Sequence, residues 1–244
     1  MPVLAAAIGL SLVGSIGGML VASGILFVRD ETRTRLVATL ISFAVGTMLA
    51  ASLLKLLPEA LEQLPAQAAL GSLLAGVLTF FVLEKLVLWR HCHETGDCAV
   101  HNSAASLVIV GDAFHTFVDG AIIGAAALTS IPLGVTAAIA AAAHEVPQEI
   151  GDYAVLLHAG YSRAGAFTLN LLAGIAGIAG AVTIYFASAP VPAVLPYAIA
   201  FAAGSFLYVA MTDLIPSLHR GQAAPNPLRQ VALIAAGVLA ILAL

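Results

Sequence analysis

Long runs of apolar residues, separated by short polar stretches, fill the chain from one end to the other. Each run is close to the ~20 residues that a helix needs to cross the hydrocarbon core of a bilayer. The pattern predicts eight membrane-spanning helices, at residues 3–28, 36–57, 66–89, 104–129, 132–158, 164–188, 193–216 and 228–244. We therefore expect an all-α integral membrane protein in which residues 1–244 form a single transmembrane domain.

The composition also favours a membrane protein. Of the 244 residues, 61% are hydrophobic and 9% are charged, whereas a soluble domain carries about 25% charged residues. So few charges cannot cover a surface that faces water, and we expect a lipid bilayer, and no nucleic acid, as a partner. The first apolar run lacks a preceding basic segment and is longer than the apolar part of a signal peptide, so we interpret it as the first span.

Basic residues mark one side of the predicted membrane domain. Short loops rich in lysine and arginine lie on the cytoplasmic face. The loops after spans one, three, five and seven hold seven of the nine basic residues: Arg29, Arg33, Arg35, Arg90, Arg163, Arg220 and Arg229. Both termini are therefore predicted to face the periplasm or the exterior, and the loop at about 90–103 to face the cytoplasm. For a bacterial protein the compartment is the inner cell membrane.

Two of the predicted spans share a sequence pattern. In the second span, FAVG ends at Gly46 and Pro58 follows twelve residues later; in the seventh, FAAG ends at Gly204 and Pro216 follows at the same distance. The two spans run in opposite directions, which is typical of the inverted repeats of transporters with a central binding site. We expect helices 1–3 and 6–8 to form the repeats around helices 4–5. The alternative is chance recurrence in Ala- and Leu-rich helices, but the matched spacing favours a true repeat.

The fourth predicted span carries ionisable residues at membrane depth. Such residues are costly there and by default indicate a functional site. His115 and Asp119 are four residues apart and share one helix face. Asp112, three residues before His115, extends that face toward the predicted cytoplasmic end.

The fifth predicted span carries a second polar cluster. His144 and Gln148 share one face, and Glu145 and Glu149 form another pair about 100° round the helix. A short loop joins the two spans, so they are antiparallel neighbours whose polar groups can converge. Imidazole and carboxylate together suit Zn²⁺, Fe²⁺ or Mn²⁺, and a cation relieves the repulsion between buried carboxylates. Pro147 should kink this helix beside the cluster, as irregular backbone does where it lines a cavity.

Two other interpretations of these clusters stay open. A single histidine inside a membrane helix is often a hydrogen-bonded core residue. Chains of Asp, Glu and His also serve as proton relays. The combination of His115 and Asp119 with His144, Glu145 and Gln148 favours a metal site over either.

At these residues the sequence resembles the ZIP family of divalent-metal transporters. The family carries His-Asn-x-x-Asp-Gly in its fourth helix and His-Glu-x-Pro-His-Glu in its fifth. Here residues 115–120 read HTFVDG and residues 144–149 read HEVPQE. The LLPE stretch at 56–59, the stretch at 150–157 and Asn170 are also similar, so the resemblance covers nearly the whole chain.

This resemblance implies an eight-helix transporter with outward termini and a set of metal ligands. The implied primary site is His115, Asp119, His144 and Gln148, with Glu145 contributing to or bridging a second site. Met48 resembles a position that adds a thioether ligand, although a core methionine is an equal alternative. The full set of candidate metal ligands is His115, Asp119, His144, Glu145, Gln148, Met48, Glu149 and Asp112.

Three residues depart from the family pattern. Thr116 replaces the usual asparagine, which weakens a second metal site. Gln148 replaces a frequent histidine and gives an oxygen ligand and a harder site. Lys55 stands where some members carry histidine, either as a tethered cation near the outer vestibule or as a side chain that snorkels outward.

The predicted cytoplasmic loop carries further potential ligands, namely His91, Cys92, His93, Cys98 and His101. Their spacing is not that of a zinc finger. One hypothesis is that the loop captures metal as it emerges on the cytoplasmic side. The alternative is a flexible polar loop.

Together these features predict uptake of divalent cations into the cytoplasm by alternating access, with Zn²⁺ as the bound and transported ion, or else Fe²⁺, Mn²⁺ or Cd²⁺. Asp112, Asp152 and His158 lie toward the exit side. We expect no enzymatic activity, and a homodimer remains open. One alternative is an intramembrane metalloprotease, against which Gln148 and Pro147 both argue because that enzyme needs two histidines on one helix face. The other is a proton-conducting channel.

Overall fold

The computed structural model describes residues 2–25, 27–91, 100–188, 192–219 and 226–244, and these residues form helices and connecting turns with no strand among them. The first repeat comprises α1 (Pro2–Leu12), η1 (Val13–Gly17), α2 (Gly18–Ile25), α3 (Asp30–Ala50), η2 (Ala51–Leu56), α4 (Leu57–Gln63) and α5 (Ala66–His91). The central pair is α6 (Val100–Thr129) and α7 (Ile131–His158). The second repeat comprises α8 (Arg163–Ser188), η3 (Pro192–Val194), α9 (Leu195–Val209), η4 (Ala210–Leu214), α10 (Ile215–His219) and α11 (Pro227–Leu242).

Consecutive segments join into long rods that follow the predicted spans. Within the described residues, six helical stretches are long and apolar enough to cross a membrane: Pro2–Ile25, Arg35–Gln63, Ala66–Lys85, Ile109–Thr129, Arg163–Ser188 and Leu195–Leu214. α11 is apolar but shorter, and α7 is not among the six. The prediction of an all-α membrane protein is confirmed, and the count of eight spans stays a prediction.

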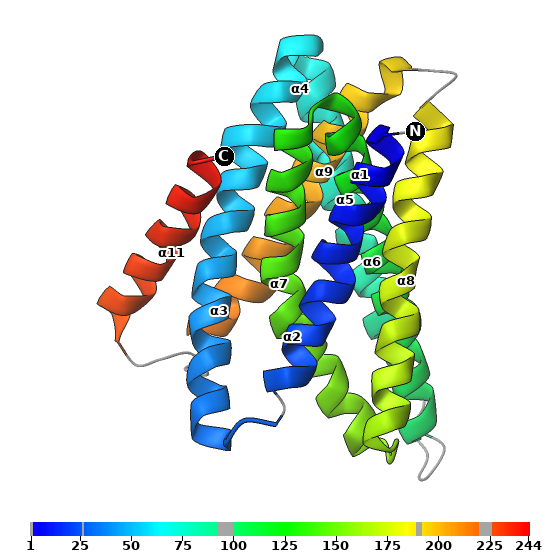
Figure 1. The fold of residues 1–244 in the computed structure, drawn as a ribbon, viewed down its shortest axis with the longest axis vertical. Helices are drawn as coiled ribbons and strands as arrows, with labels where there is room; N and C mark the ends of the chain where they lie inside the picture. Colours follow the sequence, from blue (N-terminus) through cyan, green and yellow to red (C-terminus); the bar gives the residue numbers. More distant parts are fainter. Residues whose placement is uncertain (1, 26, 92–99, 189–191, 220–225) are drawn as a thin grey trace.

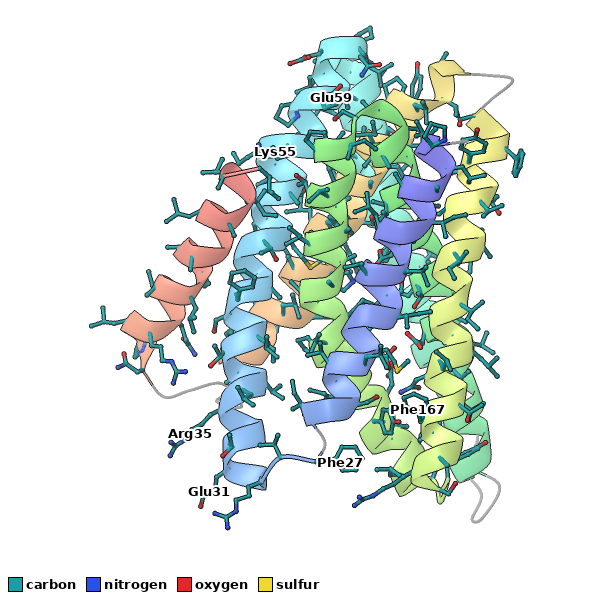
Figure 2. All side chains as sticks on the ribbon, in the orientation of Figure 1. Phe27, Glu31, Arg35, Lys55, Glu59 and Phe167 are labelled. Atoms are coloured by element: carbon teal, nitrogen blue, oxygen red, sulfur yellow. The ribbon has the colours of Figure 1, made fainter. Side chains whose placement is uncertain are left out.

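The rods pack as a bundle in which α7 lies among the other helices (Figure 1). The N- and C-termini lie toward one end of this bundle, and the turn from α2 to α3 lies at the other end. Figure 2 places Arg35 at the end with that turn, and Lys55 and Glu59 toward the opposite end. This arrangement agrees with the predicted common side for the two termini. The assignment of that side to the exterior stays a prediction.

The two FAxG patterns make equivalent contacts, as an inverted repeat requires. A Cβ atom at Gly46 would lie 2.0 Å from the carbonyl oxygen of Ile234 in α11, and one at Gly204 would lie 2.0 Å from that of Leu73 in α5. Glycine is needed at both positions because the helix backbones touch there. The reciprocal contacts are those of Gly237 with the Phe43 carbonyl and Gly76 with the Phe201 carbonyl. The same pair of contacts therefore joins α3 to α11 and α9 to α5.

Both repeats also contain a π-helical segment at nearly the same position. η2 begins at Ala51, five residues after Gly46, and η4 begins at Ala210, six residues after Gly204. Each segment ends shortly before the proline of the pattern, Pro58 or Pro216. A π-helical segment inserts an extra residue into a helix and is frequent at functional sites. The hydrophobic pattern carried no sign of these segments.

Close packing of small residues also fixes the central helix α6. A Cβ atom at Gly120 would lie 1.8 Å from the carbonyl oxygen of Gly177, and one at Gly180 would lie 1.9 Å from that of Phe117. The backbones of α6 and α8 are thus in direct contact. This contact sets the rotation of α6 about its axis, and hence the direction in which its polar residues point.

Candidate metal site

Three of the predicted ligands converge between α6 and α7. One ligand atom from each of His115, Asp119 and His144 lies within 4.8 Å of the others. His144 Nε2 is 3.0 Å from Asp119 Oδ2, and His115 Nε2 is 3.7 Å from the same oxygen. The two Nε2 atoms are 3.0 Å apart. The i,i+4 pair on α6 and the histidine of α7 therefore point at one common position.

A hydrogen bond to the backbone determines which ring nitrogen of His144 is free to bind a metal ion. Its Nδ1 lies 3.0 Å from the carbonyl oxygen of Ala140, one turn earlier on α7. When Nδ1 carries the proton and donates a hydrogen bond to this carbonyl, the lone pair of Nε2 faces Asp119 and His115. Metal-binding histidines are commonly oriented in this way through the second ring nitrogen. Two electron-rich atoms 3.0 Å apart are stable only with a proton or a cation between them.

Aromatic rings on the neighbouring helices α5 and α9 pack against the two imidazoles. Phe80 of α5 packs edge-on against His115, with ring centroids 5.4 Å apart. Phe206 of α9 packs against His144 at 6.0 Å. Asp119 and His144 are each only 1% exposed. The group is therefore largely shielded from solvent, which strengthens its electrostatic interactions.

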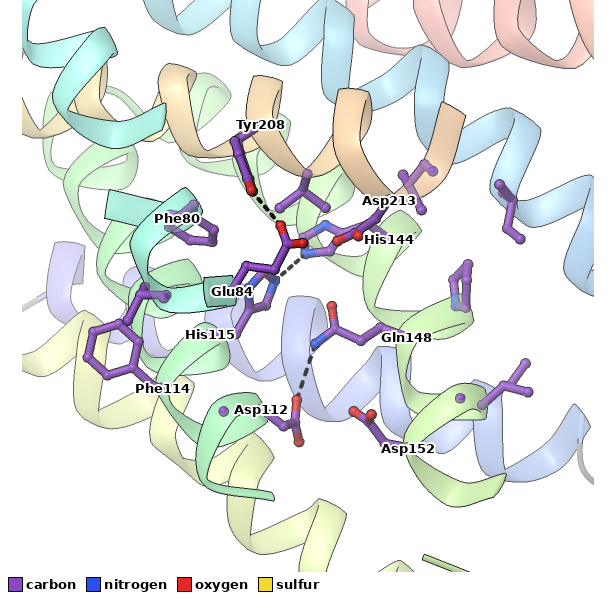
Figure 3. Close-up of a pocket in the computed structure, with 18 of the residues that line it drawn as sticks. Phe80, Glu84, Asp112, Phe114, His115, His144, Gln148, Asp152, Tyr208 and Asp213 are labelled. Carbon is purple, nitrogen blue, oxygen red and sulfur yellow. Dashed lines mark hydrogen bonds between the residues drawn. The ribbon is translucent and has the colours of Figure 1, made fainter. Parts of the chain in front are cut away.

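A cavity of about 590 Å³ reaches the group from one side (Figure 3). His115 and His144 line it together with residues that lie toward the end of the bundle where α2 meets α3. On α6 and α7 these are Asp112, Gln148 and Asp152, and on α3 they are Val37 and Ile41.

The opposite side of the group is closed by packed apolar side chains. Ile123, two turns beyond His115 on α6, and Ala137, two turns before His144 on α7, are both 0% exposed. Phe206 belongs to the same buried cluster. His115 and His144 thus line a cavity that extends toward the α2–α3 end of the bundle, with packed apolar side chains on their other side.

This arrangement can be set beside the known proteins that the chain resembles. The family model described as ZIP Zinc transporter matches residues 89–244. The chain belongs to the ZIP zinc transporter family. It is 31% identical to the zinc transporter ZIP13 of Pongo abelii over 226 residues, which cover 86% of this chain and 67% of that protein.

This ZIP protein also matches two further members of the family over shorter stretches. It is 41% identical to ZIP10 of Danio rerio over 119 residues, which cover 49% of this chain and 14% of ZIP10. It is 38% identical to ZIP4 of Homo sapiens over 112 residues, which cover 46% of this chain and 17% of ZIP4. The chain thus spans two thirds of ZIP13 and a much smaller part of the other two. The family resemblance predicted from the helix motifs is confirmed.

Gln148 of this ZIP protein lies in the cavity, one turn from His144. Its amide nitrogen donates a hydrogen bond to Asp112 Oδ1 at 3.4 Å. Its amide oxygen points to the side on which His115 and His144 lie (Figure 3). The predicted ligand is therefore placed beside the converging group and also tied to Asp112.

Met48 is 0% exposed and belongs to the apolar cluster that also contains Phe206. Its role as a thioether ligand stays a prediction. Lys55, in η2, is half-buried and does not line the cavity. Asp152 lines the cavity, as expected for an exit residue. The side chain of His158 and the loop with Cys92 and Cys98 lie outside the described residues.

The remaining predicted ligands form a separate group. One ligand atom from each of Asp112, Glu145 and Glu149 lies within 4.8 Å of the others, and the three residues are 4%, 1% and 1% exposed. Thr116 lies between two of them, with its hydroxyl 3.5 Å from both Asp112 Oδ1 and Glu145 Oε1. Two negative charges 4 Å apart repel by about 4 kcal/mol at an effective dielectric constant of about 20. The prediction assigned Glu145 to a second or bridging site and named Glu149 and Asp112 as further candidate ligands; the structure brings the three together.

Sequence reasoning missed several residues of the cavity wall. Glu84 of α5 and Tyr208 of α9 both line it, and the Tyr208 hydroxyl donates a hydrogen bond to Glu84. Asp213 lines the same cavity. All three lie inside predicted spans, so the rule that ionisable groups at membrane depth are functional could have identified the two acids.

Proposed function

We propose that this ZIP protein transports divalent metal ions across the membrane, Zn²⁺ foremost, and that His115, Asp119 and His144 bind the ion in transit. The observation that carries the proposal is the convergence of their ligand atoms beside a cavity that His115 and His144 line. Family membership supports metal transport, since ZIP13, ZIP10 and ZIP4 are all named zinc transporters.

The spacing of the three ligand atoms supports an ion of the size of Zn²⁺. Ligands about 2.0–2.1 Å from a tetrahedral zinc ion are roughly 3.4 Å from one another. The three distances within the group are 3.0, 3.0 and 3.7 Å. Two imidazoles and one carboxylate are also a ligand set that zinc accepts with a fourth position open. The amide oxygen of Gln148 or a water molecule would fill that position.

The direction of transport follows from the cavity and the basic residues. The cavity leads toward the end of the bundle where Arg35 lies, and arginine-rich short loops mark the cytoplasmic face. The structure then represents an inward-facing state of an uptake transporter. Movement of one group of helices against the other would open the outer side, as in other repeat-built transporters.

Release would run along oxygen ligands on the cavity wall. Gln148, Asp112 and Asp152 follow one another away from the histidines on α6 and α7, and Glu84 and Asp213 face the same space. An ion leaves such a pathway only if each successive site binds it weakly enough. Oxygen ligands bind Zn²⁺ less strongly than imidazole does, so this order of ligands favours release.

An intramembrane metalloprotease explains the same residues less well than a transporter does. The HExxH enzymes need the glutamate beside the metal as a general base. Glu145 instead groups with Asp112 and Glu149 and does not line the cavity that holds His144. Family membership also supports a transporter and not an enzyme.

Uptake into reconstituted vesicles tests the proposal. Zn²⁺, Fe²⁺, Mn²⁺ and Cd²⁺ would compete in one assay, with wild type compared with His115→Ala and His144→Ala. We expect Zn²⁺ to compete best and both variants to lose most uptake. Thr168→Ala is the matched control, since Thr168 is exposed and its hydroxyl donates a hydrogen bond to the carbonyl of Ala164. Unchanged uptake in both histidine variants would remove the assigned site.

A further inference from the structure

We propose that α3 and α11 bind the headgroup of an anionic phospholipid at the end of the bundle where both helices begin. Arg35 of α3 and Arg229 of α11 would hold its phosphate, and exposed apolar side chains beside Arg229 would contact its acyl chains. This end is the one predicted to face the cytoplasm, and anionic lipids give the cytoplasmic leaflet its negative surface. The inference concerns the lipid around the protein and does not depend on the transported metal.

The two helices touch near the middle of the bundle and separate toward this end. Their backbones meet where a Cβ atom at Gly46 would lie 3.1 Å from the Cα of Gly237. From there toward its first residue, Pro227, α11 leans away from α3 (Figure 1). The contact between the helices at the predicted cytoplasmic end is therefore made by side chains.

Arg229 makes that contact. Its Nη2 donates a hydrogen bond of 2.9 Å to Thr39 Oγ1 on α3. The Thr39 hydroxyl in turn donates a hydrogen bond of 2.7 Å to the carbonyl oxygen of Arg35, one turn earlier. In Figure 2 the Arg35 side chain extends from α3 on the side of α11. The two guanidinium groups are thus held near enough to each other to bind one anion.

Neither arginine has an acidic partner in the part of the chain that the structure describes. The ion pairs found there join Asp119 to two histidines, and Glu31, one turn before Arg35, forms none with it. A guanidinium carries five N–H donors, of which Arg229 gives one to the neutral hydroxyl of Thr39. Guanidinium groups bind phosphate through paired hydrogen bonds. A phosphate therefore supplies both the charge and the acceptors that this pair of arginines lacks.

The surface around Arg229 indicates a lipid and not a free anion. Leu228 and Val231 of the same helix are 81% and 63% exposed. On a membrane helix, large exposed apolar side chains face acyl chains, and an arginine near the helix end reaches from among them to the interface. Basic pockets between membrane helices on the cytoplasmic side bind anionic headgroups in this way. The exposed apolar residues thus add a surface for acyl chains, which a free phosphate does not have.

Arg163 provides the matched comparison. It is also an exposed arginine, and it is the first residue of α8. α8 packs on α6 and lies on the other side of the bundle from α3 and α11 (Figure 1). A phospholipid attracted only by the general positive charge of this end would depend on Arg163 as much as on Arg35 or Arg229.

Native mass spectrometry of the purified full-length chain tests the site. The protein would be titrated in detergent with phosphatidylglycerol or with phosphatidylcholine of the same acyl chains. We expect the first phosphatidylglycerol to bind to wild type at least about tenfold more tightly than phosphatidylcholine. Each basic residue contributes about fivefold to the binding of an anionic lipid, so Arg35→Gln combined with Arg229→Gln should remove most of this preference. Thr39→Val should weaken binding less, and Arg163→Gln should bind as wild type does.

Four results would overturn the proposal. They are equal affinity of wild type for the two lipids, an unchanged preference in the double variant, an equal loss in Arg163→Gln, and displacement of phosphatidylglycerol by millimolar inorganic phosphate. The third would mean that general surface charge attracts the lipid, and the fourth that a soluble anion fills the site. If the double variant does not fold, Arg229→Gln alone takes its place, with an expected loss of about fivefold. The measurement does not involve Zn²⁺, so failure of the transport site would leave its result unchanged.

Discussion

The two polar groups between α6 and α7 lie next to each other, yet they differ in ligands and in access. The first group, His115, Asp119 and His144, offers two nitrogen ligands, and both of its histidines line a cavity. The second, Asp112, Glu145 and Glu149, lies largely behind the cavity wall and offers oxygens alone. The difference arises because 100° of rotation separates neighbouring residues on a helix. One pair of helices can thereby present two polar groups to different surroundings.

The largest expected effect is on the rate of Zn²⁺ uptake, which should differ between variants of the two groups. His144→Ala removes a nitrogen ligand from the ion in transit, so we expect Zn²⁺ uptake to fall by about 100-fold or more, beyond the 10–100-fold loss usual for residues that only support a metal ligand. Glu149→Gln should leave uptake measurable, because Glu149 does not line the cavity. Initial rates of ⁶⁵Zn uptake into vesicles measure both. Equal losses in the two variants would show that both groups belong to one transport site.

The sequence predicted the helices well and the two groups only in part. The membrane demands long apolar segments, so hydropathy locates the rods, and the i,i+4 spacing of His115 and Asp119 correctly predicted a shared face. Which faces meet depends on the rotation of each helix, and this is set by backbone contacts such as that of Gly120 with Gly177. No local pattern encodes that rotation. For this reason the sequence did not predict that Asp112 of α6 lies with Glu145 and Glu149 of α7.

Residues brought in from distant helices were the hardest to predict. Phe80 and Phe206 orient the two imidazoles from α5 and α9, and in the sequence they are indistinguishable from other apolar positions. Tyr208 and Glu84 pair across 124 positions of the chain. The repeat predicts that α5 packs on α9, but it does not predict which polar side chains face the cavity between them.

A smaller effect is expected at the boundary between the two groups. Gln148 bonds to Asp112 while its amide oxygen faces the histidines. Gln148→His would place a third imidazole one turn from His144, so we expect tighter Zn²⁺ binding and slower release. Both KM and the maximal uptake rate should then fall by about threefold to tenfold, within the range by which groups around a metal tune it. A rise in KM would show instead that Gln148 is needed as an oxygen ligand.

The smallest effect concerns the cavity wall. Tyr208→Phe removes the hydrogen bond from its hydroxyl to Glu84, and a bond to a charged group contributes about 1.5–3 kcal/mol. The freed carboxylate would face the cavity and hold a departing ion longer, so we expect the maximal uptake rate to fall by about twofold to threefold and KM to change little, as for a step after binding. Tyr197→Phe, on the exposed face of α9, is the matched control. A larger change in KM than in the maximal uptake rate would show that Tyr208 acts in ion binding and not in release.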